Sequence, residues 1–534
     1  MRPAPAGPWL PTPAGVVRAP TARPASIPAP PQTLWPTTPV TYKRRRRKSS
    51  RGALALVIAL AVGAGARQVY IDNARVKDGD ALVDREPATW DARVQPYADF
   101  VQRTRGLTYK RPVEVDFLSE AEYVDLFEPT GSTPSDSEQA VADQYADLLN
   151  AEGLTSGVDE GDTQTRVAQT ASLGFYDFDS KRIFVRGDVL TPAVQVVLVH
   201  ELTHALQAQH FDIELGGADD FVLRSIVEGD AMRIEWKYAD TLPDGEREQA
   251  NVDNTLDEET SAELDQIPWA LVQQTFAPYD LGPIFLAYLD GHGGDAAINR
   301  AFTDLPSEEQ LVTPSLYGGG DADRPVDVAA PAGAEVLDTR PWAMFDALVM
   351  LDAWLPWLQA RTPFDGWAGG SIVTYEQDGA GGRVCFTAAA EFDTDVDAAG
   401  FSAAVTAWGA AAASPVLPQT VGTRITFESC DRGDGAALPP KPAFSTSEQV
   451  LLESTILAAV AGDAAASQTE PPASGDPTAV TVPLNEVEKH CIVRTMIDDP
   501  DLGPLFLEDT FTAQQDDIVL LRTTIARNTC GVFP

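Results

Sequence analysis

The apolar and polar positions of this chain predict alternating short strands and helices around one long apolar helix. Residues 193–209 contain no Gly or Pro, and their apolar residues recur at helical spacing. Thr191 can cap the N-terminus of such a helix, and Pro192 suits its first position. We therefore expect a buried helix that begins just after Thr191.

The segment before this helix alternates in polarity as a β-hairpin does. Residues 174–187 predict two strands that turn near Asp179 and Ser180 and lead straight into the helix. A strand in this place often forms the sheet edge along which a peptide lies. An ordinary edge hairpin explains the pattern equally well.

The rest of the chain adds elements at both ends of this unit. A strand is expected at 112–117, and residues 371–430 read as strand, strand, helix, strand. Helices are expected at 86–107, 137–153, 221–238, 267–289, 296–302 and 342–358.

The N-terminal region reads as a tail followed by a membrane anchor. Residues 1–42 are rich in Pro and Ala and are expected to be disordered. A basic run, 43–48, precedes an uncharged apolar segment that we extend to residues 52–71, a signal anchor. A cleavable signal peptide is the alternative, since Ala64-Gly65-Ala66 resembles a cleavage site. Both interpretations place residues 72–534 outside the cytoplasm, either on the cell membrane as a single-pass protein or, after cleavage, secreted.

Charge is distributed unevenly along the chain. The formal net charge is −40, although residues 1–51 hold ten Lys or Arg and no acidic residue. The remainder is therefore strongly acidic, which favours solubility and repels nucleic acid. We expect the membrane as a partner, no nucleic acid and no obligate protein partner.

All four cysteines lie in the last third of the chain. An even number of cysteines in an exported chain predicts disulfides, with three possible connectivities. We expect Cys385–Cys430 and Cys491–Cys530, because each pair is local in sequence and flanks one compact unit. Each loop would contribute roughly 4 kcal/mol in the chain-entropy account. A cysteine zinc site is the alternative, but no CxxC spacing occurs.

The central helix carries the most specific chemical signal, an HExxH motif at residues 200–204. In a helix, His200 and His204 lie on one face and can present two imidazoles to one ion. Glu201 projects about 100° away, so that it can hold a metal-bound water without being a ligand. This is the layout of a zinc hydrolase.

A catalytic zinc needs a third protein ligand, and two candidates follow the motif. His210 occupies the position of the third ligand in metzincins, but Gln207 replaces the Gly that breaks the helix there. A continuous helix would turn His210 about 120° away from His204. Glu228 is the gluzincin candidate, on a helix that a turn at 216–217 could fold back.

The motif and its surroundings resemble a family. Residues 200–207 (HELTHALQ) with 228–231 (EGDA) are similar to bacterial membrane-anchored zinc metallopeptidases of the gluzincin type. The hairpin ends at 175–177 and 185–187, Pro278-Tyr279 and residues 307–310 (SEEQ) also resemble this family. The resemblance covers roughly residues 95–430.

This resemblance implies a fold, a ligand set and a reaction. The fold would be α+β and zincin-like, with a twisted sheet above the active-site helix and a helical lower part. His200, His204 and Glu228 would bind Zn²⁺, and Glu201 would act as general base while zinc-bound water attacks a peptide carbonyl. Tyr279 is the candidate oxyanion donor, although a packed structural tyrosine is the simpler interpretation.

The chain also departs from the gluzincin pattern. Many gluzincins carry an Asp four residues after the Glu ligand to orient a zinc-bound His, and here that position is Met232. Asp230 is a possible substitute on another helical face. His292 and His490 are expected to be structural.

The expected domains are 1–51 (basic Pro-rich cytoplasmic tail), 52–71 (anchor), 86–370 (zincin-like domain), 371–438 (strand and helix extension) and 439–534 (helical C-terminal module). The expected function is zinc-dependent peptide-bond hydrolysis outside the cytoplasm, with a peptide or protein as substrate. Two alternatives remain: a catalytically silent surface-anchored binding protein with a structural metal, and a metzincin-like protease that uses His210.

Overall fold

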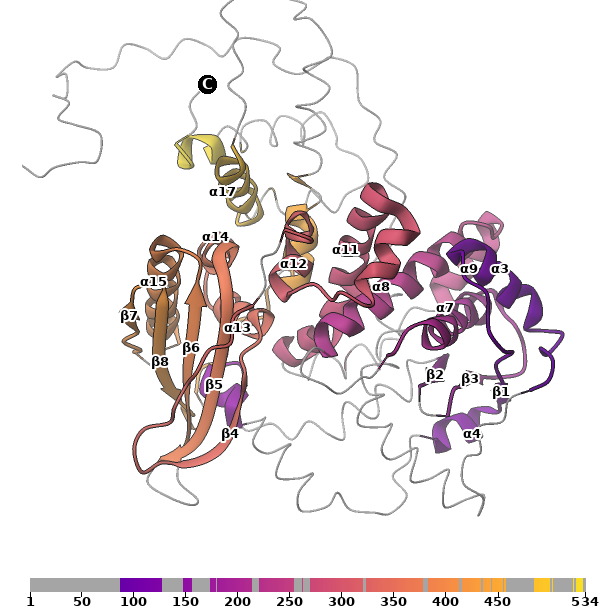
Figure 1. Cartoon of the computed structure of the whole chain (residues 1–534), viewed down its shortest axis with the longest axis horizontal. Coiled ribbons are helices and arrows are strands. Elements are labelled where there is room, and N and C mark those ends of the chain that lie inside the picture. Colours follow the sequence, from indigo (N-terminus) through magenta and orange to yellow (C-terminus); the bar gives the residue numbers. More distant parts are fainter. Residues whose placement is uncertain are drawn as a thin grey trace, which may run out of the picture. The chain divides into compact units, whose positions relative to one another are not determined.

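The computed structural model describes residues 87–126, 147–155, 173–178, 180–213, 220–253, 262, 269–319, 323–377, 383–412, 415–433, 436–442, 444–454, 456–457, 485–499, 502, 522 and 525–531. These residues all belong to the unit Arg47–Pro534. They mix helices with two small sheets, which confirms the coarse α+β class (Figure 1).

A three-stranded sheet lies beside the central helix. Its strand order is β1 (Val115–Leu118), β3 (Arg182–Arg186), β2 (Gly174–Asp177), with β1 parallel and β2 antiparallel to β3. Strands β2 and β3 form the predicted hairpin. Helix α7 (Pro192–His210) packs against both strands, so the hairpin lies directly beside the HExxH motif.

Helix α7 forms as the sequence predicts. The Thr191 hydroxyl accepts the backbone N–H of Val194 at 3.3 Å, and Pro192 is the first helical residue. Most residues of the helix are buried, which explains why it is apolar on more than one face. It ends at His210, because Phe211 adopts an extended backbone.

Helices α8 (Asp220–Ala239) and α11 (Trp269–Ala301) cross at two glycines. A Cβ on Gly282 would lie 1.9 Å from the carbonyl oxygen of Ser225, and a Cβ on Gly229 would lie 2.4 Å from the Gly282 carbonyl carbon. Only glycine permits such a close backbone approach. The crossing fixes the position of α8 relative to α11 beside Glu228, because Glu228 immediately precedes Gly229.

The second sheet has five antiparallel strands in the order β4 (Glu335–Pro341), β5 (Trp367–Gln377), β6 (Arg383–Phe392), β8 (Arg424–Cys430), β7 (Gln419–Val421). Helix α15 (Asp395–Ala411) packs against β6, β7 and β8 (Figure 1). This confirms the predicted strand, strand, helix, strand order and adds β4 and β7.

The other elements are α3 (Gln95–Arg105), α4 (Glu120–Asp125), α9 (Asp244–Asp253), α12 (Glu308–Val312), η1 (Pro314–Leu316), α13 (Met344–Asp352), α14 (Trp357–Arg361), η2 (Thr362–Gly366) and α17 (Glu486–Ile497). Residues 446–454 are also helical. The expected helix at 137–153 is described only from 147 onward, and it is helical to 152.

Two hydrophobic clusters hold these elements together. One joins the three-stranded sheet to α3 and α7, and the larger one joins α11, α13, α15 and the five-stranded sheet. Helix α8 contributes Ile234 to the first cluster and Ile226 and Val227 to the second. Glu228 therefore sits on the helix that is shared by both cores.

The structure contains both predicted disulfides. Cys385 and Cys430 are directly paired residues of β6 and β8, and Cys491 on α17 is bonded to Cys530. No cysteine among the described residues is free, so the alternative of a cysteine zinc site at these four positions is excluded.

Two sequence expectations need correction. The single helix predicted at 342–358 is two helices, α13 and α14, because Pro356 has an extended backbone and acts as the N-cap of α14. Strand β5 begins at Trp367 and pairs with β4, so the sheet crosses the predicted boundary between 370 and 371. The two helices expected at 267–289 and 296–302 are confirmed, because α11 is divided into two by the non-helical backbone of Gly294.

The tail at 1–51, the anchor at 52–71 and the turn at 216–217 lie outside the described residues. Within the described part of the chain, no helix is long and apolar enough to cross a membrane.

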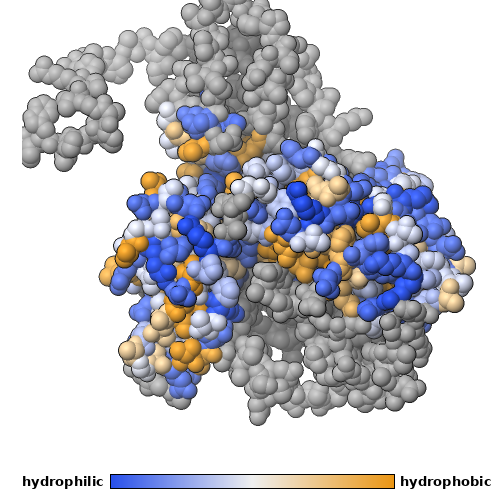
Figure 2. Space-filling model, viewed as in Figure 1, coloured by the Kyte–Doolittle hydropathy of each residue, from blue (hydrophilic) through white to orange (hydrophobic). Residues whose placement is uncertain are grey.

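Apolar side chains form part of the exposed surface. Figure 2 shows hydrophilic residues over much of the visible surface, interrupted by apolar residues over the five-stranded sheet and over the central helices. Val336, Leu417 and Val421 are among the large exposed apolar side chains in or beside that sheet. Exposed apolar side chains are normal on folded proteins.

Candidate metal centre

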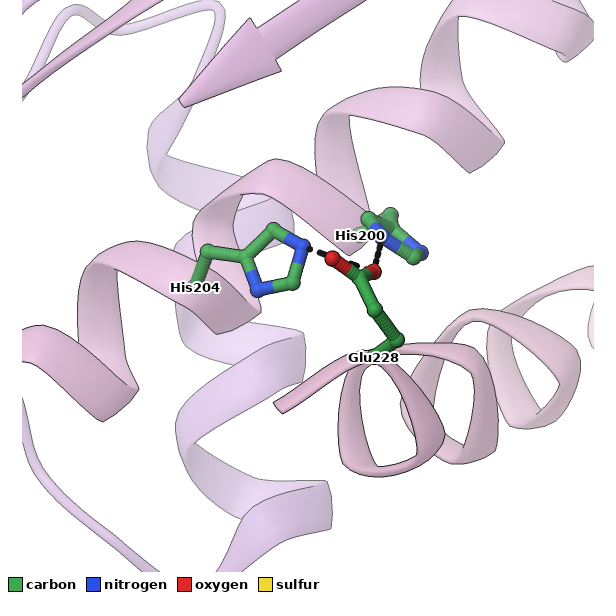
Figure 3. Close-up of side chains that lie close together, drawn as sticks. All are labelled: His200, His204 and Glu228. Carbon is green, nitrogen blue, oxygen red and sulfur yellow. Dashed lines mark hydrogen bonds and ion pairs between the residues drawn. The ribbon is translucent and has the colours of Figure 1, made fainter. Parts of the chain in front are cut away.

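Helices α7 and α8 bring three metal-ligating side chains together. His200 and His204 project from one face of α7, and Glu228 reaches them from α8 (Figure 3). The Glu228 Oε2 lies 3.2 Å from His200 Nε2 and 3.4 Å from His204 Nε2. All three side chains are buried, and one ligand atom from each lies within 4.8 Å of the others.

These distances fit a metal ion. In a tetrahedral zinc site with ligand distances of about 2.1 Å, neighbouring ligand atoms are about 3.4 Å apart. The buried His204 Nε2 makes no hydrogen bond and has Glu228 Oε2 at 3.4 Å, which leaves this nitrogen available to an ion. Two imidazoles and a carboxylate are a donor set that divalent metals use, so this group could hold a metal ion.

The group is strongly polarised without an ion. Burial works against the charge of Glu228, but the nearby imidazoles of His204 and His200 hold its pKa at about 2. Burial also opposes protonation of His200, but hydrogen bonds to Glu228 and Glu235 raise the pKa of this imidazole to about 10. A metal ion would therefore displace a proton from His200.

Glu201 lies beside this group and is not part of it. Its Oε2 accepts the backbone N–H of Tyr176 on β2 at 2.7 Å, and its buried Oε1 has no hydrogen-bond partner. Burial raises the pKa of Glu201 to about 7, partly offset by His200 and His204. A carboxylate with one anchored oxygen, one unpartnered oxygen and a pKa near neutrality is suited to general-base chemistry.

Each imidazole is held at its second nitrogen by a residue that the sequence analysis did not identify. Glu235 Oε2 lies 2.9 Å from His200 Nδ1, and Gln207 Oε1 lies 3.1 Å from His204 Nδ1. Such partners set the orientation of metal-binding histidines. The sequence does contain a signal for Glu235. It lies seven residues after Glu228, so both side chains project from one face of α8.

Asp230, the suggested substitute for the missing gluzincin Asp, does not bond either imidazole. Its Oδ2 accepts a hydrogen bond from Gln207 Nε2 at 3.1 Å, so Asp230 is connected to His204 only through Gln207. The role we had considered for Asp230 is filled by Glu235 at His200 and by Gln207 at His204.

Tyr279 lies buried close to the ligand group. Burial, reinforced by the negative charge of Glu228, raises the pKa of its phenol well above the ordinary value. The phenol is therefore a hydrogen-bond donor at neutral pH. Its position on α11 follows from the Gly229–Gly282 crossing, because Tyr279 lies one helical turn before Gly282.

The other three histidines lie elsewhere. His210 Nε2 contacts the carbonyl oxygen of Thr108 at 2.8 Å, on the side of α7 that faces away from Glu228. His292 is exposed and stacks on Tyr288, and His490 contacts Glu453. The prediction that a continuous α7 turns His210 away from the site is confirmed.

Comparisons with protein families, curated proteins and solved structures find no match to this chain. The fold and the site therefore define its class: a mixed α+β protein with a buried His-His-Glu group able to hold a metal ion.

Proposed function

We propose that this protein is a zinc-dependent peptide hydrolase with a zincin-like fold of the gluzincin type. The observation that carries the proposal is the buried group of His200, His204 and Glu228 with the unpartnered Oε1 of Glu201 beside it. The sheet and helix pair that hold these residues are consistent with such a fold. Zinc is the metal we propose, because two histidines, one glutamate and an open position suit a catalytic zinc.

The chain's own residues would divide the work of hydrolysis. Bound Zn²⁺ would act as a Lewis acid and make a coordinated water acidic near neutral pH. Glu201 would take a proton from the attacking water and deliver it to the leaving amine. The Tyr279 hydroxyl would donate to the carbonyl oxygen as negative charge develops.

The strand beside the site offers a direction for the substrate. Tyr176 belongs to β2, the last strand in the order of the described sheet, and its N–H already holds Glu201. We propose that an extended peptide lies along β2, which would bring its backbone to the catalytic carboxylate without demanding a particular side chain.

We further propose that the catalytic part acts outside the cytoplasm. Both disulfides support this, because disulfides persist mainly in oxidising compartments. Protease treatment of intact cells should degrade the catalytic part, and protection of that part would contradict the topology.

The decisive variant for the reaction is Glu201→Gln in the full-length chain. It keeps the three ligands, so it should retain zinc and lose at least about 100-fold of its peptide turnover. His292→Gln, at an exposed position, is the matched control and should retain both. A wild type that binds zinc and cleaves no peptide in a broad peptide library would favour the silent binding protein with a structural metal.

A further inference from the structure

A chain of buried polar residues runs from α3 to His204. Arg105 Nε donates to Asp230 Oδ2 at 2.7 Å, and Gln207 Nε2 donates to the same oxygen at 3.1 Å. Gln207 Oε1 then faces His204 Nδ1 at 3.1 Å. Arg105, Gln207, Asp230 and His204 are all essentially inaccessible to solvent.

The partners of Gln207 determine which way its amide points. Its nitrogen lies 3.1 Å from the Asp230 carboxylate and 3.0 Å from the carbonyl oxygen of Val227, and both of these groups only accept hydrogen bonds. The amide nitrogen must therefore lie on that side, and the oxygen must face His204. An oxygen at this place can only accept, so His204 Nδ1 must carry a hydrogen.

Asp230 is itself held as an anion. Its carboxylate forms ion pairs with Arg105 at 2.7 Å and with Arg233 at 3.1 Å. The second amino group of Arg105 donates to Asn299 Oδ1 at 2.6 Å, so α11 also anchors the guanidinium. The fixed positive charge of Arg105 therefore determines the direction of each hydrogen bond from Asp230 through Gln207 to the His204 imidazole.

We propose that Gln207, held by Asp230 and Arg105, is the positioning residue that fixes Nδ1–H on His204 and turns its Nε2 toward the metal. This inference rests on the metal-binding part of the proposed function, and it assigns a purpose to the residue that replaces the helix-breaking glycine of metzincins. The Gln207 side chain touches His204 and not the metal position, so it acts through the ligand.

The test uses two variants of the full-length chain. Gln207→Met keeps the volume and removes both the acceptor for His204 and the donor to Asp230. Gln209→Met is the matched control, because Gln209 is a glutamine of the same helix whose amide holds the backbone of Lys110 and Arg111 instead. Thermal unfolding of each variant shows whether it is folded, and Gln207→Leu replaces Gln207→Met if the latter is not.

Zinc affinity, measured by competition with a chelator, is the first readout. Gln207→Met should bind Zn²⁺ about 10–100-fold more weakly than the wild type. Gln209→Met should stay within a few-fold of it. Equal affinity of Gln207→Met and the wild type would overturn the proposal.

The second readout needs neither zinc nor activity. With only five histidines in the chain, ¹⁵N-histidine labelling can resolve the Nδ1–H proton of His204. It should exchange slowly in the wild type and in Gln209→Met, and rapidly in Gln207→Met. Slow exchange in Gln207→Met would also overturn the proposal. A wild type that binds zinc and hydrolyses nothing would reject the proposed reaction alone, because both readouts would still stand.

Discussion

Two buried clusters in this molecule combine histidine with carboxylates, and they balance their charge differently. The C-terminal network consists of Arg361, Asp365, Glu453, His490 and Arg494. Arg494 bonds Asp365 through two nitrogens at 2.7 Å and donates to Glu453 at 2.9 Å. Burial opposes the charge of Glu453, but Arg494 holds the pKa of this carboxyl far below its ordinary value.

The candidate metal centre has no such cations. Within the described residues, the carboxylates of Glu201, Glu228 and Glu235 form no ion pair with an arginine or lysine. Their partners are two imidazoles and a backbone N–H. In the C-terminal network, guanidinium groups of the protein neutralise the buried carboxylates. In a cluster of carboxylates and imidazoles, a bound metal ion can supply that positive charge.

A third buried carboxylate, Asp352, is stabilised in another way. Asp352 is buried, with Thr446 and Gln449 donating to its Oδ2 at 2.7 Å, and the described residues place no cation against it. Burial raises the pKa of this carboxyl to about 7, against hydrogen bonds that lower it. Asp352 is therefore stabilised by protonation. Glu453 is stabilised by arginine, and Glu228, in our proposal, by a metal.

The largest expected effect on stability is in the C-terminal network. Arg494→Met leaves the buried Glu453 without its main cation and the more exposed Asp365 with fewer partners, and should cost about 3–5 kcal/mol of unfolding free energy. The cost should be the same with and without zinc, and zinc affinity should be unchanged. Chemical denaturation with and without a chelator measures both. Arg247→Met, which removes an exposed pair with Asp244, is the control and should cost less than about 1 kcal/mol.

The next effect is at the helix crossing under the metal centre. Gly282→Ala would place a Cβ 1.9 Å from the Ser225 carbonyl oxygen, so α8 and α11 must separate, at about 3 kcal/mol. Because Glu228 lies at this crossing, zinc affinity should fall as well. The matched control is Gly291→Ala on the same helix, where a Cβ meets nothing within 4 Å. It should stabilise by up to about 1 kcal/mol, since alanine is the better helix former. Equal zinc affinity in Gly282→Ala and Gly291→Ala would show that the crossing does not position Glu228.

The smallest effect concerns pH. The folded pKa of Asp352 is about 7 against an ordinary 3.8, so the folded state keeps a proton that the unfolded state releases. Its contribution to stability is therefore present at low pH and is lost as pH rises from about 4 to about 7. Asp352→Asn cannot titrate, so its stability relative to the wild type should rise between pH 5 and pH 8, by roughly 2–3 kcal/mol. Denaturation with a chelator present at pH 5 and at pH 8 measures the difference. An unchanged difference at the two pH values would contradict the neutral state of Asp352.

Local chemistry explains what the sequence analysis predicted. The α7 helix followed from Thr191, Pro192 and an unbroken apolar run, and the position of His210 followed from helical periodicity alone. The disulfides followed from proximity in sequence. These signals depend on residues near one another in the chain, where spacing converts directly into geometry.

The missed features depend on contacts between distant segments. Strand β4 has an irregular burial pattern, so its sequence alternates too weakly to be recognised. The Gly229–Gly282 crossing needs both helices to be placed before either glycine has meaning. In the sequence, Gln207 is notable only as the residue that replaces the metzincin Gly. Its proposed role depends on Asp230 and Arg105, which are distant in sequence and adjacent in the fold.

The most direct test of the central claim is the zinc content of three purified full-length proteins. The wild type and His210→Ala should each hold one zinc per chain, and Glu228→Gln should hold almost none, because a neutral amide is a poor ligand for this ion. His210→Ala loses only a contact with the Thr108 carbonyl oxygen, so it controls for the loss of a polar side chain near the motif. A metal-free wild type, or a Glu228→Gln protein that still holds one zinc while His210→Ala holds none, would contradict the assignment of His200, His204 and Glu228 as the metal site.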